Sequence, residues 1–98
     1  MENTMSAETK WQRDIAMAGL SIITKDREYA LVLMDGKGRL SVWDKTYSDR
    51  RIAIGQATRL ENLSRGDNFT RGYAVVKFGD KVVVYIDTNT VLYHGPVA

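Results

Sequence analysis

The sequence contains no cysteine and a single histidine, and these two shortages exclude several kinds of chemistry. Without cysteine there are no disulfide bonds and no thiolate ligands for a metal. His94 alone cannot form a zinc site with other histidines, and its place near the C-terminus disfavours a Ser-His-Asp or Cys-His catalytic group. The glycines that follow Asp35 lack the spacing of a phosphate-binding loop. We therefore expect a protein that is not an enzyme and uses no metal or other cofactor.

Long hydrophobic runs are also missing. No apolar stretch approaches the roughly 20 residues of a membrane span, and the N-terminus lacks the apolar segment of a signal peptide. We expect no membrane association and an intracellular location, cytoplasmic or nuclear. The 98 residues, 44% of them hydrophobic and 27% charged, are enough for one globular domain. Because residues 1–9 are polar and without pattern, we expect a disordered tail there and a single domain over residues 10–98.

The strongest local pattern lies between residues 28 and 45, and it predicts a β-hairpin. An apolar run over residues 29–34 is followed by the turn Asp35–Gly38 and by an alternating segment over residues 39–44. Asp-Gly between two such runs is a strong hairpin signal, because glycine adopts positive φ without steric cost.

The alternation in the second strand of this hairpin divides its residues between two faces. If Leu40 and Val42 face a core, then Arg39, Ser41 and Trp43 form a row on the opposite face. The reverse arrangement would bury an unpaired guanidinium with the tryptophan, which costs several kcal/mol. We therefore expect Trp43 to be exposed.

The rest of the chain has turn signals about every ten residues, a spacing typical of small sandwiches and barrels. In this interpretation Gly19 marks a β-bulge. The connection that follows the hairpin ends at Gly55, and within it Ser48 and Asp49 could cap one short helical turn. Helix is the competing prediction for residues 14–24 and 56–63, which are rich in helix formers. The predicted strands are residues 14–24, 29–34, 39–44, 56–63, 73–78 and 81–86, with residues 91–93 as a short last strand. A closed barrel is favoured over a sandwich, because closure protects the edges of strands.

Three segments in the middle of the chain follow one another in a recognisable order. A strand ends in Asp-Gly (residues 31–36), a second ends in Trp-Asp (residues 38–44), and a connection containing glycine leads into the next strand (residues 54–60). This order, which spans residues 19–87, resembles the oligonucleotide/oligosaccharide-binding (OB) family, specifically the single-stranded DNA-binding modules of replication protein A and of simple single-strand-binding proteins. The resemblance implies an all-β, five-stranded Greek-key barrel with little or no helix. It also implies that Trp43 stacks on a base.

Charge is distributed in a way that fits this resemblance. Between Lys37 and Arg71 there are eight basic and four acidic residues, and eight of the fourteen basic residues of the chain are arginine. Arginine suits phosphate contacts and stacking on bases, and single strands are bound by basic grooves with aromatic platforms. The candidate contacts for single-stranded nucleic acid are Lys37, Arg39, Ser41, Trp43, Arg59, Arg65, Phe69, Arg71, Tyr73 and Lys77.

The function that we expect is therefore non-catalytic binding of single-stranded nucleic acid, with DNA favoured over RNA. The loops over residues 24–28 and 64–72 would flank the binding face. The alternative is a protein-interaction subunit of a larger nucleic-acid-processing complex, in which the same face binds protein and Trp43 is the anchor. A third interpretation is an SH3-like barrel that binds chromatin or a peptide. The sequence leaves open the oligomeric state, and also whether Phe69 stacks on a base or packs on the barrel.

Overall fold

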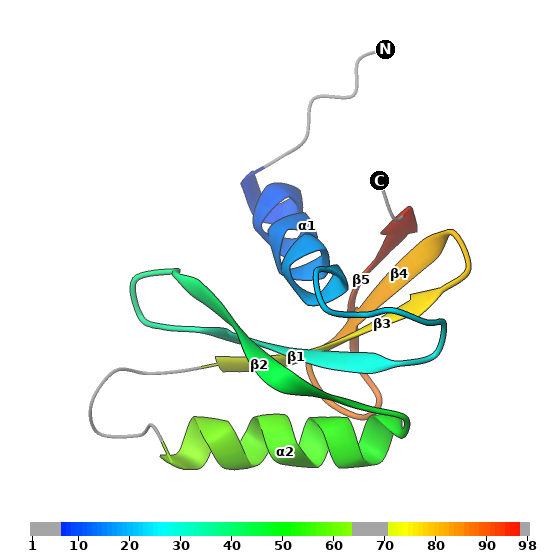
Figure 1. The fold of residues 1–98 in the computed structure, drawn as a ribbon. Helices are drawn as coiled ribbons and strands as arrows, with labels where there is room; N and C mark the ends of the chain where they lie inside the picture. The colour runs from blue at the N-terminus through cyan, green and yellow to red at the C-terminus, as the bar shows by residue number, and fades with distance from the viewer. Residues whose placement is uncertain (1–6, 64–70, 97–98) are drawn as a thin grey trace.

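The computed structural model describes residues 7–63 and 71–96. Five strands form one antiparallel sheet with a helix on each of its two faces (Figure 1). In chain order the elements are α1 (Ala7–Leu20), β1 (Tyr29–Met34), β2 (Leu40–Tyr47), α2 (Arg50–Leu63), β3 (Arg71–Phe78), β4 (Lys81–Tyr85) and β5 (Val91–Pro96). Across the sheet the order is β2-β1-β3-β4-β5, so the hairpin β1–β2 stands at one edge and β5 at the other.

The two faces of the sheet carry two separate hydrophobic cores, because side chains alternate along each strand. On β3, Tyr73 and Val75 face α1, whereas Ala74 and Val76 face α2. Since both faces are covered, the central strands are continuous apolar runs such as residues 82–84. The core under α1 includes Ile15, Ala16, Val32, Tyr73, Val75, Val82 and Val84, and the core under α2 includes Tyr29, Leu31, Ala53, Ile54, Ala57, Ala74, Val76, Val83 and Tyr85.

Both helices approach the central strand β3 closely, and each does so at a glycine. A Cβ on Gly19 of α1 would lie 2.5 Å from the Cβ of Val75, and a Cβ on Gly72 of β3 would lie 2.9 Å from the Cβ of Ala57 on α2. No side chain fits at either position without a shift of the backbone or of its neighbour. The absence of a side chain therefore sets the distance of each helix from the sheet.

The predicted strand over residues 14–24 is wrong, because most of it belongs to α1. Trp11, Ile15 and Gly19 recur every four residues on the side of the helix that meets the sheet. The helix begins at Ala7, inside the tail predicted for residues 1–9, whereas residues 1–6 lie outside the described part. Gly19 is a packing position in a helix and not a bulge in a strand.

The predicted strand over residues 56–63 is also wrong, because these residues form the second half of α2. Asp49 caps this helix: its carboxylate accepts hydrogen bonds from the N–H groups of Arg51 (2.7 Å) and Ile52 (3.4 Å). The cap was predicted for a single turn, but the helix continues to Leu63. It continues because Ala53, Ile54 and Ala57 form a buried face at helical spacing.

The sheet has the five strands that the resemblance implies, but it is open and it is accompanied by two helices. In the described residues β2 and β5 are opposite edges that do not pair with each other. The all-β barrel with little or no helix, and with it the OB-type closure, is therefore not confirmed. The two helices, one on each face, cover the sheet without closure. The predicted hairpin is confirmed, as are the strands that became β3, β4 and β5.

Candidate functional site

The tip of the β1–β2 hairpin is organised by the carboxylate of Asp35. It accepts hydrogen bonds from the N–H groups of Lys37 (2.8 Å) and Arg39 (2.9 Å), and its second oxygen accepts one from Nε of Arg39 (2.7 Å). These contacts, led by the backbone N–H of Arg39, hold the pKa of Asp35 below its ordinary value. Gly38 takes the positive φ of +80° that the turn requires. The Arg39 side chain stays 70% exposed despite its ion pair.

Further along β2 the strand contains a bulge that changes the surroundings of Trp43. Val42 pairs with Val32 and Thr46 pairs with Ala30, so three residues of β2, from Trp43 to Lys45, stand opposite a single residue of β1. The indole Nε1 of Trp43 donates a hydrogen bond to the hydroxyl oxygen of Tyr47 (3.0 Å). Both aromatic rings pack against the core under α2. Trp43 is therefore half-buried against this core, whereas the alternation of residues in β2 predicts an exposed ring.

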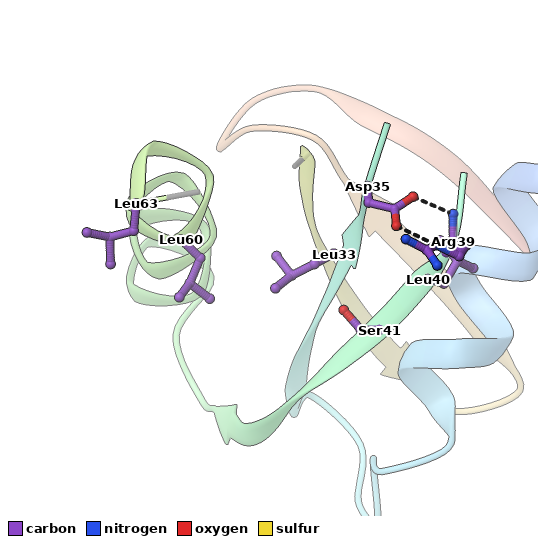
Figure 2. Close-up of a pocket in the computed structure, with 7 residues that line it drawn as sticks. All are labelled: Leu33, Asp35, Arg39, Leu40, Ser41, Leu60 and Leu63. Carbon is purple, nitrogen blue, oxygen red and sulfur yellow. Dashed lines mark hydrogen bonds and ion pairs between the residues drawn. The ribbon is translucent and has the colours of Figure 1, made fainter. Parts of the chain in front are cut away.

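An open groove of about 380 Å³ separates the C-terminal end of α2 from the β1–β2 hairpin (Figure 2). Its floor is apolar: Leu60 points from α2 toward Leu33 of β1. One rim is polar and consists of the Asp35–Arg39 pair and the Ser41 hydroxyl. Leu63 borders the groove but points away from the sheet, and 71% of its surface is exposed.

Only part of the predicted binding set gathers at this groove. Arg39 and Ser41 line it, and Lys37 lies in the adjoining turn. Leu33, Leu60 and Leu63 were not predicted as site residues. The spacing of three residues between Leu60 and Leu63 could have indicated that they lie near each other. It does so only if residues 56–63 form a helix, and they were predicted as a strand.

Tyr73 is not available to a ligand, which corrects its predicted role. It is 5% exposed, lies under α1, and packs against Trp11 with ring centroids 6.2 Å apart. Burial raises the pKa of its hydroxyl. The prediction failed because alternation places Tyr73 on one face of the sheet but cannot show that a helix covers that face.

The remaining predicted residues are dispersed. Lys77 lies at the end of β3 away from the hairpin tip, where its Nζ is 3.9 Å from a carboxylate oxygen of Asp26. Arg59 is exposed on α2, and Arg71 begins β3 opposite Met34. Arg65 and Phe69, with most of the predicted loop over residues 64–72, lie outside the described residues. The other predicted flanking loop, residues 24–28, lies at the Lys77 end of the sheet, because the N–H of Arg27 donates to the carbonyl oxygen of Lys77.

Within the described part of the chain, no three His, Asp or Glu side chains come close enough together to hold a metal ion. In the same residues, neither helix is long and apolar enough to cross a membrane. The features available for binding in the described residues include the groove, the hairpin tip and the free edges of β2 and β5. Comparison with protein-family models, with curated proteins and with solved structures found no match.

Proposed function

We propose that this protein is a non-catalytic protein-interaction domain that binds an extended segment of a partner along the edge of β2, with one apolar side chain of the partner in the groove. The observation that carries the proposal is the place of the groove, which opens directly beside an unpaired strand edge. Main-chain hydrogen bonds at an edge supply affinity, and a pocket beside the edge supplies specificity. Like the alternative in the sequence analysis, the proposal gives the chain a protein-binding role, but it places the anchor in the groove and not at Trp43, and it names no nucleic-acid-processing complex.

The backbone of β2 supports this mode of binding. The strand pairs only with β1 in the described residues, so one of its edges is free. The hairpin is closed by a hydrogen bond from the N–H of Asp35 to the carbonyl oxygen of Arg39 (3.0 Å). Because hydrogen-bonding groups alternate along a strand, those of Leu40 and Val42 are directed away from β1. An unpaired edge of this kind is a template for another strand.

The groove supplies the side-chain pocket. A partner residue opposite Ser41 would project to the same face of the sheet as Ser41, toward Leu33 and Leu60. The volume of about 380 Å³ is within the range of small ligand pockets. Burial of one leucine-sized side chain contributes about 1.5–3 kcal/mol. Together with a few edge hydrogen bonds, this anchor is suited to a weak or moderate complex.

A phage-displayed library of short random peptides tests the proposal. We expect enrichment of peptides with apolar residues at alternate positions and without proline in the paired stretch, because proline cannot donate a ladder hydrogen bond. Ser41→Trp would fill the groove and abolish binding of the selected peptides. Ser48→Trp is the matched control, since Ser48 is exposed beyond the end of β2 and should leave binding unchanged. Failure of the library to yield such peptides, or equal binding by both variants, would contradict the proposal.

Binding of single-stranded nucleic acid is the second candidate, favoured by the exposed Lys37 and Arg39 beside Ser41 at the hairpin tip. Titration with an oligo(dT) strand at two salt concentrations separates the two functions. A nucleic-acid site would lose affinity at high salt and on Lys37→Glu, and would gain or keep affinity on Ser41→Trp, which adds a stacking ring. Binding with this signature, and no selected peptide, would replace the first candidate by the second. The predicted membership of the OB family stays a prediction under either outcome.

A further inference from the structure

The hairpin tip beside the groove carries more positive than negative charge. Asp35 is the only acidic side chain among the described residues that line the groove, and it is paired with Arg39. Lys37, in the same turn, is exposed and forms no ion pair within the described residues. Two basic residues and one acidic residue therefore leave an excess of one positive charge at this rim.

The α2 side of the groove does not supply the missing negative charge. The only acidic residue of α2 is Glu61, and its carboxylate accepts a hydrogen bond from the N–H of Gly72 on β3 (3.1 Å). Because β3 and β2 lie on opposite sides of β1, this contact directs Glu61 away from the β2 edge. Arg59, exposed next to Leu60, adds a further positive charge to this end of the helix. The surroundings of the groove are therefore complementary to an acidic ligand.

The contact between Asp35 and Arg39 leaves most of the guanidinium available (Figure 2). Asp35 binds Nε, so the N–H groups of the two terminal nitrogens have no carboxylate partner within the described residues. The side chain is 70% exposed although Nε is held at 2.7 Å. Because the ion pair already restricts this side chain, a second carboxylate can bind it with a smaller loss of conformational entropy.

We infer that the partner segment carries an aspartate or glutamate two residues after the apolar residue that enters the groove, and that this carboxylate binds Arg39. The inference rests on the proposed function and adds the chemistry of the partner. An antiparallel partner strand runs toward the hairpin tip. If its apolar residue stands opposite Ser41, the second residue after it stands opposite Arg39. Both then project to the face of the sheet that Ser41 and Arg39 share at the groove.

The antiparallel direction follows from the rest of the sheet. Every pair of neighbouring strands in it is antiparallel, and this pairing is slightly more stable per residue than the parallel one. Further along β2, Asp44 and Lys45 are both exposed and balance each other, and the bulge interrupts the strand there. The excess charge is therefore confined to the tip, where the partner strand continues toward its C-terminal end.

The carboxylate belongs to a side chain and not to the C-terminus of the partner. A side chain opposite Arg39 projects out of the sheet on the same face as Arg39, whereas a terminal carboxylate lies close to the plane of the sheet. Peptides displayed on phage through their C-termini offer only side-chain carboxylates, so the library of the preceding section includes the proposed ligand. A bound peptide in the parallel direction would instead need its acidic residue two positions before the apolar one.

The selected peptides test this inference. We expect Asp or Glu to be enriched at the second position after the anchor, which is the apolar residue whose change to alanine weakens binding most. In a synthetic copy of the most enriched peptide, replacement of that acidic residue by its amide should weaken binding about two- to fivefold, the range of a cross-strand ion pair. The difference between the acidic and the amide peptide should shrink as salt is added. Isothermal titration calorimetry measures both effects.

Variants of the protein identify the group that binds the carboxylate. Arg39→Gln keeps the backbone N–H that Asp35 binds, and it should weaken binding of the acidic peptide about two- to fivefold. The amide peptide should bind Arg39→Gln and the wild type equally, because the two changes remove the same contact. Arg39→Lys, which keeps a positive charge, should retain the preference for the acidic peptide. Lys81→Gln is the matched control: Lys81 is exposed at the start of β4, at the opposite end of the sheet from the hairpin tip.

The possible failures of the inference and of the proposed function are distinct. Selected peptides that lack an acidic residue at the second position, or carry it before the anchor, would overturn the inference and leave the proposed function in place. Additive losses for Arg39→Gln and the amide peptide would do the same. A library that yields no peptide would remove both. In that case, binding of oligo(dT) that is weakened by Arg39→Gln would assign the positive tip to a nucleic-acid phosphate.

Discussion

Gly19 and Gly55 are both inside helices, but the structure predicts opposite responses to replacement by alanine. At Gly19 the new Cβ would lie 2.5 Å from Val75, so α1 must shift and the free energy of unfolding should fall by about 1–3 kcal/mol. At Gly55 the new Cβ would enter open space, and alanine should raise the free energy of unfolding by about 0.5–1 kcal/mol. Urea unfolding measures both changes. Stabilisation by Gly19→Ala would contradict the close approach of α1 to β3.

Asp35 should make stability depend on pH in the acid range. Hydrogen bonds from the backbone N–H of Arg39 and from other donors of the turn lower the pKa of Asp35, so the folded state binds fewer protons than the unfolded state. This stabilisation is present above the unfolded pKa of about 3.9 and is lost as the pH falls through the lower folded pKa. Two other carboxylates also have lowered pKa values. Glu28 accepts a hydrogen bond from the Thr46 hydroxyl, and Asp87 accepts one from the N–H of Asn89.

Urea unfolding across a series of acid pH values checks this dependence. The free energy of unfolding should decline below pH of about 4, and the decline should be shallower in Asp35→Asn, which cannot ionise. Asp14→Asn is a suitable control, because Asp14 is an exposed carboxylate on α1 outside these three clusters. A wild-type curve as shallow as that of Asp35→Asn would contradict the role of the hairpin carboxylate.

Helix α2 depends on its N-terminal cap. The carboxylate of Asp49 satisfies two N–H groups in the first turn, and Asp49→Ala leaves them to water. We expect a loss of about 1 kcal/mol in the free energy of unfolding, measured by urea titration of helical circular dichroism. Ser48→Ala, one residue earlier and with an exposed side chain, should change it little. An equal loss in both variants would place the start of the helix elsewhere.

The elements differ in how far the sequence alone could determine them. The hairpin was predictable because its turn is local: Asp35 and the glycines that follow it specify the conformation within five residues. The helices were missed because Gly19 and Gly55 were interpreted as breaks. Alanine, methionine and leucine fit helix or strand equally well until a neighbour is known. Gly19 is explained only by Val75, more than fifty residues away in the chain.

The candidate site was predictable only where it coincides with the hairpin. Arg39, directly before β2, and Ser41 on β2 were placed correctly on the same side of the hairpin, because alternation is a local property. The burial of Tyr73 depends on α1 covering its face of the sheet, and the contact of Trp43 with Tyr47 depends on the bulge in β2. The groove exists only because the end of α2 stands beside the hairpin. Such long-range contacts leave no periodic signal in one sequence.

At the level of the whole molecule, the sheet joins two cores that share the strand β3. One tryptophan reports on each core: Trp11, a residue of α1, packs against the core under α1, and Trp43, a residue of β2, packs against the core under α2. Because β3 contributes alternate residues to both cores, loss of either core removes the support of the other. The two helices should therefore unfold together as one cooperative unit and not one after the other.

Single-tryptophan variants test this coupling. Trp43→Phe leaves Trp11 as the fluorescent probe of the α1 core, and Trp11→Phe leaves Trp43 as the probe of the α2 core. In each variant the fluorescence transition in urea should coincide with the transition in circular dichroism, because β3 cannot lose one set of neighbours and keep the other. A Trp11 signal that changes at lower urea than the circular dichroism of its own variant would mean that α1 detaches from an intact sheet. The sharing of β3 would then not couple the two cores, and the close contact at Gly19 would contribute less than its geometry indicates.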